Sequence, residues 1–371
     1  MKTEARNITQ RTGDLVERIR VFKGEADNPF LAPRGVCLHG NRLLVSDTGQ
    51  NRVFIWHSVP EGEYQSPDVT LGQSDASGVG RNAGAQVSGS TLLYPSGLWT
   101  DGERLVVADA WNHRVLIWTH FPTEDGQAAD LVIGQPDFQG HEPNVAGIGQ
   151  PPTARSLNWP YGVWSDGKSL WVADTGNRRV LYWQDFPQES YLPADGVIGK
   201  ERFTERDYDH AHAIWPYSVK VSPEGAMAIT DTQYYRVLLW HDWTEALAQP
   251  AEVIIGQESF EGNGQNQFGW FPAAHTLNWC YDTCFHEGGL FVADTGNSRL
   301  LWHPTVPTEH NAPAADLLGQ DNFQTGSENK NSIQSTEGSY YWPFSISIEE
   351  NLMAVADTGN HRIVLNTIRN S

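Results

Sequence analysis

Residues 172–183 read VADTGNRRVLYW, and five further variants of this stretch occur along the chain. They are VSDTGQNRVFIW (45–56), VADAWNHRVLIW (107–118), ITDTQYYRVLLW (229–240), VADTGNSRLLWH (292–303) and VADTGNHRIVLN (355–366). Each copy holds an aspartate followed five residues later by an arginine, and the six aspartates stand 62, 65, 57, 63 and 63 residues apart. Such self-similarity at a nearly fixed period indicates a repeat architecture.

Each repeat predicts four short strands. A proline and an apolar run precede the aspartate, as in WPYGVWSDGK, and a glycine stands 25 residues after it in five copies. In the fifth copy Cys280 takes the place of the proline. Apolar and polar residues alternate, β-branched residues are frequent, and Gly, Asp and Asn stand between the apolar runs. These features favour strands over helices.

A single four-stranded sheet of this length cannot bury both faces, whereas six sheets arranged radially bury them against one another. The sequence therefore predicts an all-β, six-bladed β-propeller with antiparallel blades, as one domain over residues 1–371. The blades are expected to begin near residues 33, 95, 160, 216, 280 and 343. The last unit lacks a fourth strand, and the N-terminal segment 1–24 contains a strand-like stretch, VERIRVFKG, that belongs to no repeat. We expect residues 16–24 to complete the last blade and close the ring.

The ADTGNxRV pattern resembles the hallmark of NHL repeats, and the resemblance covers nearly the whole chain. It implies an NHL-type propeller. Proteins with NHL-like propellers include protein-binding platforms, RNA-binding modules of the tripartite-motif proteins and the peptidylglycine amidating lyase, so the resemblance implies a fold and no single function.

Composition narrows the range of partners. The chain has 39% hydrophobic residues and 41 aromatic ones (15 Trp, 12 Tyr and 14 Phe), enough for a large core. Its formal charge of −20 repels phosphate backbones and anionic lipids, so we expect neither a nucleic acid nor a membrane as partner. With no apolar signal core and three cysteines, the protein is predicted to be cytoplasmic.

The repeated residues have a structural interpretation. The aspartate is expected to cap its own turn, a glycine or asparagine to supply positive φ, and the arginine to pair with carboxylates or carbonyls. The tryptophan nine residues after the aspartate is expected to pack between blades.

Function is better sought where repeats deviate from one another. The second unit has Trp111, with His113 in the same turn, and the fourth has Tyr234 and Tyr235. These turns and the long variable loops emerge on one face of a propeller, here called the loop face. Exposed aromatic side chains there are typical anchors for a small molecule or a protein partner.

A second set of candidates is predicted at the mouth of the central channel. Three consecutive blades place Tyr161, Tyr217 and Tyr281 after the proline position, and only the fifth blade follows with a carboxylate, Asp282. Together with the loop-face aromatics, these residues form the predicted ligand-binding set.

An enzymatic alternative remains open. His212, His275, Asp282 and Cys280 lie in neighbouring repeats and are candidate ligands for Zn or another divalent transition metal. Such a site would support a metal-dependent lyase or hydrolase at the channel mouth, with Tyr217, Tyr281 or Asp282 as catalytic candidates.

Overall fold

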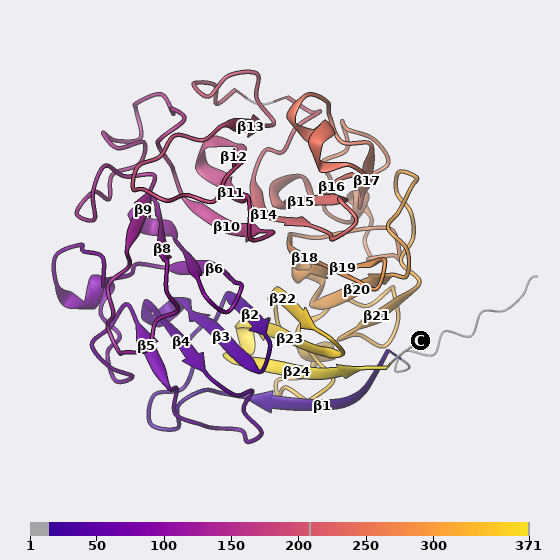
Figure 1. Ribbon diagram of the computed structural model, residues 1–371. Helices are drawn as coiled ribbons and strands as arrows, with labels where there is room; N and C mark the ends of the chain where they lie inside the picture. Colours follow the sequence, from indigo (N-terminus) through magenta and orange to yellow (C-terminus); the bar gives the residue numbers. More distant parts are fainter. Residues whose placement is uncertain (1–14, 208, 370–371) are drawn as a thin grey trace, which may run out of the picture.

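The computed structural model describes residues 15–207 and 209–369, and these residues form six four-stranded antiparallel sheets arranged in a ring (Figure 1). The predicted all-β, six-bladed propeller is confirmed. Blades 1 to 3 consist of β2 (Gly35–His39), β3 (Arg42–Asp47), β4 (Arg52–Trp56) and β5 (Val69–Leu71); β6 (Pro95–Thr100), β7 (Leu105–Asp109), β8 (Arg114–Trp118) and β9 (Leu131–Ile133); and β10 (Pro160–Ser165), β11 (Leu170–Asp174), β12 (Arg179–Trp183) and β13 (Gly196–Ile198).

The remaining blades follow the same order from the centre outward. They consist of β14 (Pro216–Val221), β15 (Met227–Asp231), β16 (Arg236–Trp240) and β17 (Val253–Ile255); β18 (Cys280–His286), β19 (Gly289–Asp294), β20 (Arg299–His303) and β21 (Asp316–Leu318); and β22 (Pro343–Glu349), β23 (Leu352–Asp357) and β24 (Arg362–Ile368) with β1 (Val16–Phe22).

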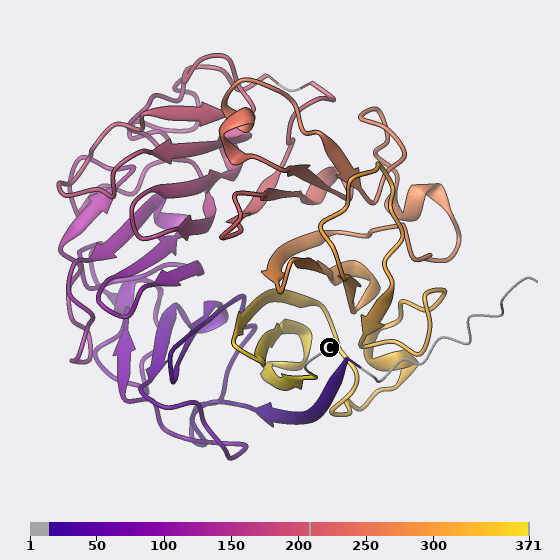
Figure 2. The same ribbon diagram turned by 45° about the vertical axis from the view of Figure 1, so that its right-hand side comes forward.

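The N-terminal strand closes the ring, as predicted. β1 pairs antiparallel with β24, with Val21 opposite Val364, and forms the outer edge of the sixth blade. In both views the indigo strand runs beside the yellow end of the chain (Figure 1 and Figure 2). Phe22 at the end of this strand is buried against Trp56 of the first blade, with ring centroids 4.9 Å apart. The first and last blades are thereby held together.

The core lies between adjacent blades. One cluster, for example, joins Leu44 and Val53 of blade 1 to Leu98 and Val107 of blade 2. The repeated tryptophans Trp56, Trp118, Trp183 and Trp240 are buried, and each donates its indole N–H to a carbonyl just before the fourth strand. In the fifth blade the buried His303 takes this position, and burial lowers its pKa to about 4.

Short 3₁₀ segments connect the strands. None of the helices formed by the described residues is long and apolar enough to cross a membrane. Six segments join the second strand of a blade to the third: η1 (Thr48–Gln50), η3 (Ala110–Asn112), η4 (Thr175–Asn177), η5 (Thr232–Tyr234), η8 (Thr295–Asn297) and η10 (Thr358–Asn360). The others lie in loops: η2 (Arg81–Gly84), η6 (Trp243–Leu247), η7 (Gln265–Phe268) and η9 (Glu328–Asn331).

The geometry of the repeated turn differs from the prediction in two respects. The aspartate makes no capping bond to its own 3₁₀ turn. The positive φ falls on the residue four positions after the aspartate, which is an asparagine only in blade 1, at Asn51. The glycine two positions after the aspartate instead allows close approach, since a Cβ at Gly176 would lie 2.7 Å from the Asn158 carbonyl oxygen.

Candidate functional site

The aspartate and arginine of each repeat form a buried clamp on the loop face. In blade 1 the Arg52 Nε donates to Asp47 Oδ2 at 2.8 Å, and the other carboxylate oxygen accepts the Leu31 N–H at 2.7 Å. The guanidinium also donates to the carbonyls of Ala76 and Asn28, which lie in the two long loops beside it. Burial raises the pKa of Asp47 to about 6, and the charge of Arg52 opposes this rise. The clamps hold the loops to the blades and are closed to a ligand.

The same ion pair recurs in all six blades. The Nε to Oδ2 distances lie between 2.6 and 2.9 Å, and the side chains are almost fully buried. The repeated motif is therefore structural, and chemistry specific to this protein must come from other residues.

A ring of six side chains closes the channel on the loop face. Each blade contributes one, and we call the set the aromatic plug: Arg34, Tyr94, Tyr161, Tyr217, Tyr281 and Phe344. The rings of Tyr161 and Tyr217 stack with centroids 4.7 Å apart, and Tyr281 contacts both Tyr217 and Phe344. The Arg34 guanidinium closes the circle, 4.2 Å from the Phe344 centroid and 5.1 Å from that of Tyr94.

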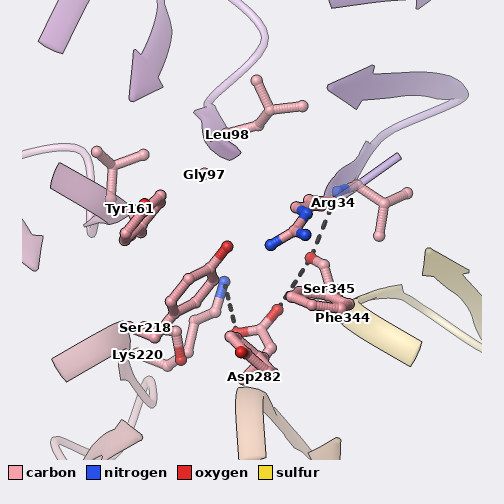
Figure 3. A pocket seen from close by; sticks show the side chains of 14 residues that line it. Arg34, Gly97, Leu98, Tyr161, Ser218, Lys220, Asp282, Phe344 and Ser345 are labelled. Carbon is pink, nitrogen blue, oxygen red and sulfur yellow. Dashed lines mark hydrogen bonds and ion pairs between the residues drawn. The ribbon is translucent and has the colours of Figure 1, made fainter. Parts of the chain in front are cut away.

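The plug leaves little space at the predicted channel mouth. The cavity beneath it measures about 30 Å³ and is lined by Arg34, Tyr161, Lys220, Asp282 and Ser345, among others (Figure 3). This volume holds one or two water molecules. Because small-molecule sites usually measure about 300–1,000 Å³, such a ligand does not fit there unless the plug rearranges.

Tyr217, which is buried, and Tyr281, which is half-buried, are unsuited to act as bases at neutral pH. Burial raises the pKa of Tyr281 to about 12 and that of Tyr217 well above its usual value, although Arg34 lowers both. The Tyr217 hydroxyl is also buried without a hydrogen-bond partner. A lyase or hydrolase that used either hydroxyl as a base would need the pKa to be lowered instead.

Asp282 serves the packing of blades 5 and 6. Its Oδ2 accepts the Ser345 hydroxyl and the Ile346 N–H, both at 3.0 Å, and Oδ1 accepts the Thr283 N–H at 2.9 Å. Lys220 of blade 4 lies 3.7 Å from Oδ1, beyond hydrogen-bond distance (Figure 3). The carboxylate therefore joins three neighbouring blades at the centre of the ring.

Trp111 and His113 lie in the same turn and differ in exposure. Trp111 is 40% exposed; its ring stacks on Tyr94 at 4.5 Å, and its indole N–H donates to the Tyr161 hydroxyl at 3.3 Å. His113 is buried, and its Nδ1 accepts the Trp159 N–H at 3.0 Å. Burial, helped by His141, lowers the pKa of His113 to about 4. Trp111 remains accessible to a ligand, whereas His113 is a structural link between blades 2 and 3.

Tyr234 and Tyr235 are half-buried on the fourth blade. Tyr234 lies against His210 and against the guanidinium of Arg236, while Tyr235 adopts the left-handed conformation, with φ at 51°. Part of each side chain is available at the surface.

The structure does not bring the four candidate metal ligands together. No three His, Cys, Asp or Glu side chains within residues 15–207 and 209–369 form a group that could hold a metal ion. His212 pairs with Asp209, Cys280 is fully buried with its Sγ 3.1 Å from the Arg236 carbonyl, and His275 is half-buried in a loop.

Sequence reasoning missed two sets of aromatic residues on the loop face. An aromatic side chain precedes the proline position in five blades, and in four of these it has positive φ: Tyr94, Trp159, Trp279 and Trp342. The second set lies in the loop before blade 5, where Phe268, Trp270 and Phe271 are 82%, 96% and 73% exposed. The first set could have been found from the sequence, because an aromatic residue recurs before the proline position. In the second set, the sequence GWFP does not indicate that its aromatic side chains are exposed.

It also missed a second, larger opening near the axis. A cavity of about 610 Å³ lies on the face opposite the loop face and is lined by residues from the second halves of all six innermost strands. Volumes of 300–1,000 Å³ are usual for small-molecule sites.

Comparisons with known proteins support the fold. No family model matches the chain, and no curated protein does. The chain is similar to the crystal structure of a protein of unknown function from Bacteroides thetaiotaomicron VPI-5482, with a TM-score of 0.51 and 13% identity over 95% of this chain and 76% of that one. An auxiliary nutrient binding protein from the same organism gives a TM-score of 0.55 and 10% identity, with the same coverage. The structure of a streptogramin B lyase gives a TM-score of 0.46 and 10% identity, over 95% of this chain and 98% of that one. At these identities the likeness to the two Bacteroides proteins concerns the fold alone.

Proposed function

We propose that the protein is a binding module that docks a partner protein on its loop face. The supporting observation is the distribution of exposed apolar side chains. Among the described residues twelve large hydrophobic side chains are exposed, and ten belong to loop-face segments: Leu31, Val79, Trp111, Ile148, Phe268, Trp270, Phe271, Trp279, Ile333 and Trp342. Exposed apolar surface gathered on one face is typical of interaction sites.

The aromatic loop before blade 5 is the strongest anchor. Phe268, Trp270 and Phe271 are almost free of packing in the isolated chain, and large aromatic residues dominate binding energy at protein interfaces. Trp111 adds a further accessible ring beside the plug. The plug itself supplies a rigid floor, because its rings contact one another around the full circle.

The proposal is tested with three immobilised forms of the protein. One is wild type, one carries Phe268→Ser, Trp270→Ser and Phe271→Ser, and the control carries Tyr64→Ser and Leu247→Ser, which remove the two exposed apolar side chains outside the loop face. A partner captured by wild type and control, identified by mass spectrometry and lost from the triple variant, is the expected result. Equal capture by all three, or capture by none, overturns the proposal.

A further inference from the structure

The cavity on the face opposite the loop face has the form of a cup at the centre of the ring. Its walls are the second halves of β2, β6, β10, β14, β18 and β22, and its volume is about 610 Å³. Towards the loop face the space narrows to the cavity of about 30 Å³ under the aromatic plug. A molecule larger than water can therefore enter the cup from one side only, and meets a floor.

Lys220 marks that floor. It lines both the cup and the narrow cavity, and it is the one Lys or Arg among the described residues that line the cup. The equivalent position in the other blades, four residues after the proline position, holds uncharged residues: Cys37, Trp99, Trp164, Cys284 and Ser347. The cation is therefore a property of one blade and is not required by the repeat.

The positive charge of Lys220 is only partly compensated. Its Nζ lies 3.7 Å from Asp282 Oδ1 and 5.7 Å from the Trp164 ring centroid. The Asp282 oxygens meanwhile accept three hydrogen bonds from Ser345, Ile346 and Thr283. An ammonium group has three donors, and a charge-assisted hydrogen bond to an anion is among the strongest available to it.

The rest of the cup restricts the kind of anion. Trp99, Trp164 and Phe285 supply aromatic wall surface, which suits a flat apolar body. The carboxylates Asp101, Asp166 and Glu349 also line the cup, and Asp101 is paired with Arg104 at 2.5 Å. Because these carboxylates repel a doubly charged phosphate about twice as strongly as a singly charged ligand, the cup disfavours a dianion. One ammonium on the floor matches a single negative charge.

We infer that the cup binds a small monocarboxylic acid with an aromatic body, its carboxylate directed at Lys220 and its ring against the tryptophan wall. This site is separate from the proposed partner surface, which lies on the opposite face.

The inference is tested by calorimetric titration with benzoate, 3-phenylpropionate and indole-3-acetate, with their amides, and with phenyl phosphate. At least one acid is expected to bind with one-to-one stoichiometry, at least tenfold more tightly than its amide and than phenyl phosphate. No binding by any acid, or acids no tighter than their amides or than phenyl phosphate, overturns it.

Variants then assign the binding to Lys220. Lys220→Met is expected to weaken binding of the acid at least tenfold, whereas Lys220→Arg stays within about threefold of wild type. Because Lys220→Met leaves Asp282 without its cation, the double variant Lys220→Met, Asp282→Asn is measured alongside. The double variant is expected to fold and to bind the acid as weakly as Lys220→Met does. Lys330→Met, which removes an exposed lysine on the loop face, is the charge-matched control and should bind the acid like wild type. Unchanged affinity in a folded double variant overturns the inference. Because the cup and the proposed partner surface lie on opposite faces, neither outcome bears on the partner surface, which has its own test.

Discussion

The Nδ1 atom of His113 accepts the backbone N–H of Trp159 at 3.0 Å, so a neutral imidazole joins the second blade to the third. Asn51 makes the same link from blade 1, its Oδ1 accepting the Tyr94 N–H at 3.1 Å. Both residues stand four positions after the repeated aspartate, so the link forms wherever the side chain at that position offers a hydrogen-bond acceptor. In blade 2 the link depends on the protonation state of the His113 imidazole.

Acid is therefore expected to weaken the fold through His113. Its pKa is about 4 in the folded protein and about 6.5 in the unfolded chain, so the unfolded state binds more protons between these values. Its contribution is fully present above pH 6.5 and is lost as the pH falls to 4, on the order of 3 kcal/mol. Urea unfolding of wild type and His113→Asn from pH 7 to 4.5 checks this. The variant keeps the acceptor and should lose less stability; parallel pH profiles would contradict the prediction.

The buried clamps should dominate stability. Asp174→Asn leaves the buried Arg179 without its carboxylate, and breaking a buried pair in this way costs about 3–5 kcal/mol. Asp321→Asn, at an exposed pair with Lys330, is the control and should cost under about 1 kcal/mol. Denaturant midpoints of the two variants measure the difference, and similar midpoints would refute the structural role of the clamp.

Two exposed tryptophans should respond differently to truncation. Trp111→Ala removes the stack on Tyr94 and the hydrogen bond to Tyr161, so we expect a loss of about 1 kcal/mol. Trp270 is 96% exposed, and Trp270→Ala should stay within about 0.5 kcal/mol of wild type. Thermal melts of both variants test the contrast. A larger shift for Trp270→Ala would mean that its loop packs in solution.

The three thiols should be slow to alkylate. Burial raises the pKa of Cys37 to about 11 and of Cys284 to about 12, and Cys280 is fully buried. Because the thiolate is the reactive form, iodoacetamide at pH 8 should react with Cys37 and Cys284 at least about 100-fold more slowly than with free cysteine. The rate should rise about tenfold per pH unit from 8 to 10. Mass spectrometry follows the labelling, and Cys280 should react only after unfolding in urea.

The fold could be predicted because residues that meet within each blade recur at a fixed spacing in the sequence. Asp174 and Arg179 must be five residues apart to meet across a short turn, and this spacing recurs in every blade. The closing strand could be predicted because the sixth unit lacks a fourth strand.

The candidate site was harder to predict because its side chains cross blade boundaries. The residue after the proline in blade 2 is Ser96, and the sequence did not indicate that Tyr94 would take its place in the plug. Nor could spacing indicate that Lys220 and Asp282, from different repeats and different positions within them, would meet on the axis.

The pairing of β1 with β24 joins the two ends of the ring and has a consequence for synthesis. At the usual rate of 5–20 residues per second, β1 waits roughly 20–70 s for its partner strand to leave the ribosome. Throughout that interval the nascent chain carries an unpaired strand, an edge that can add to strands of other chains. Ribosome stalling before β24 would leave five complete blades and an open sixth, a species prone to intermolecular β-pairing.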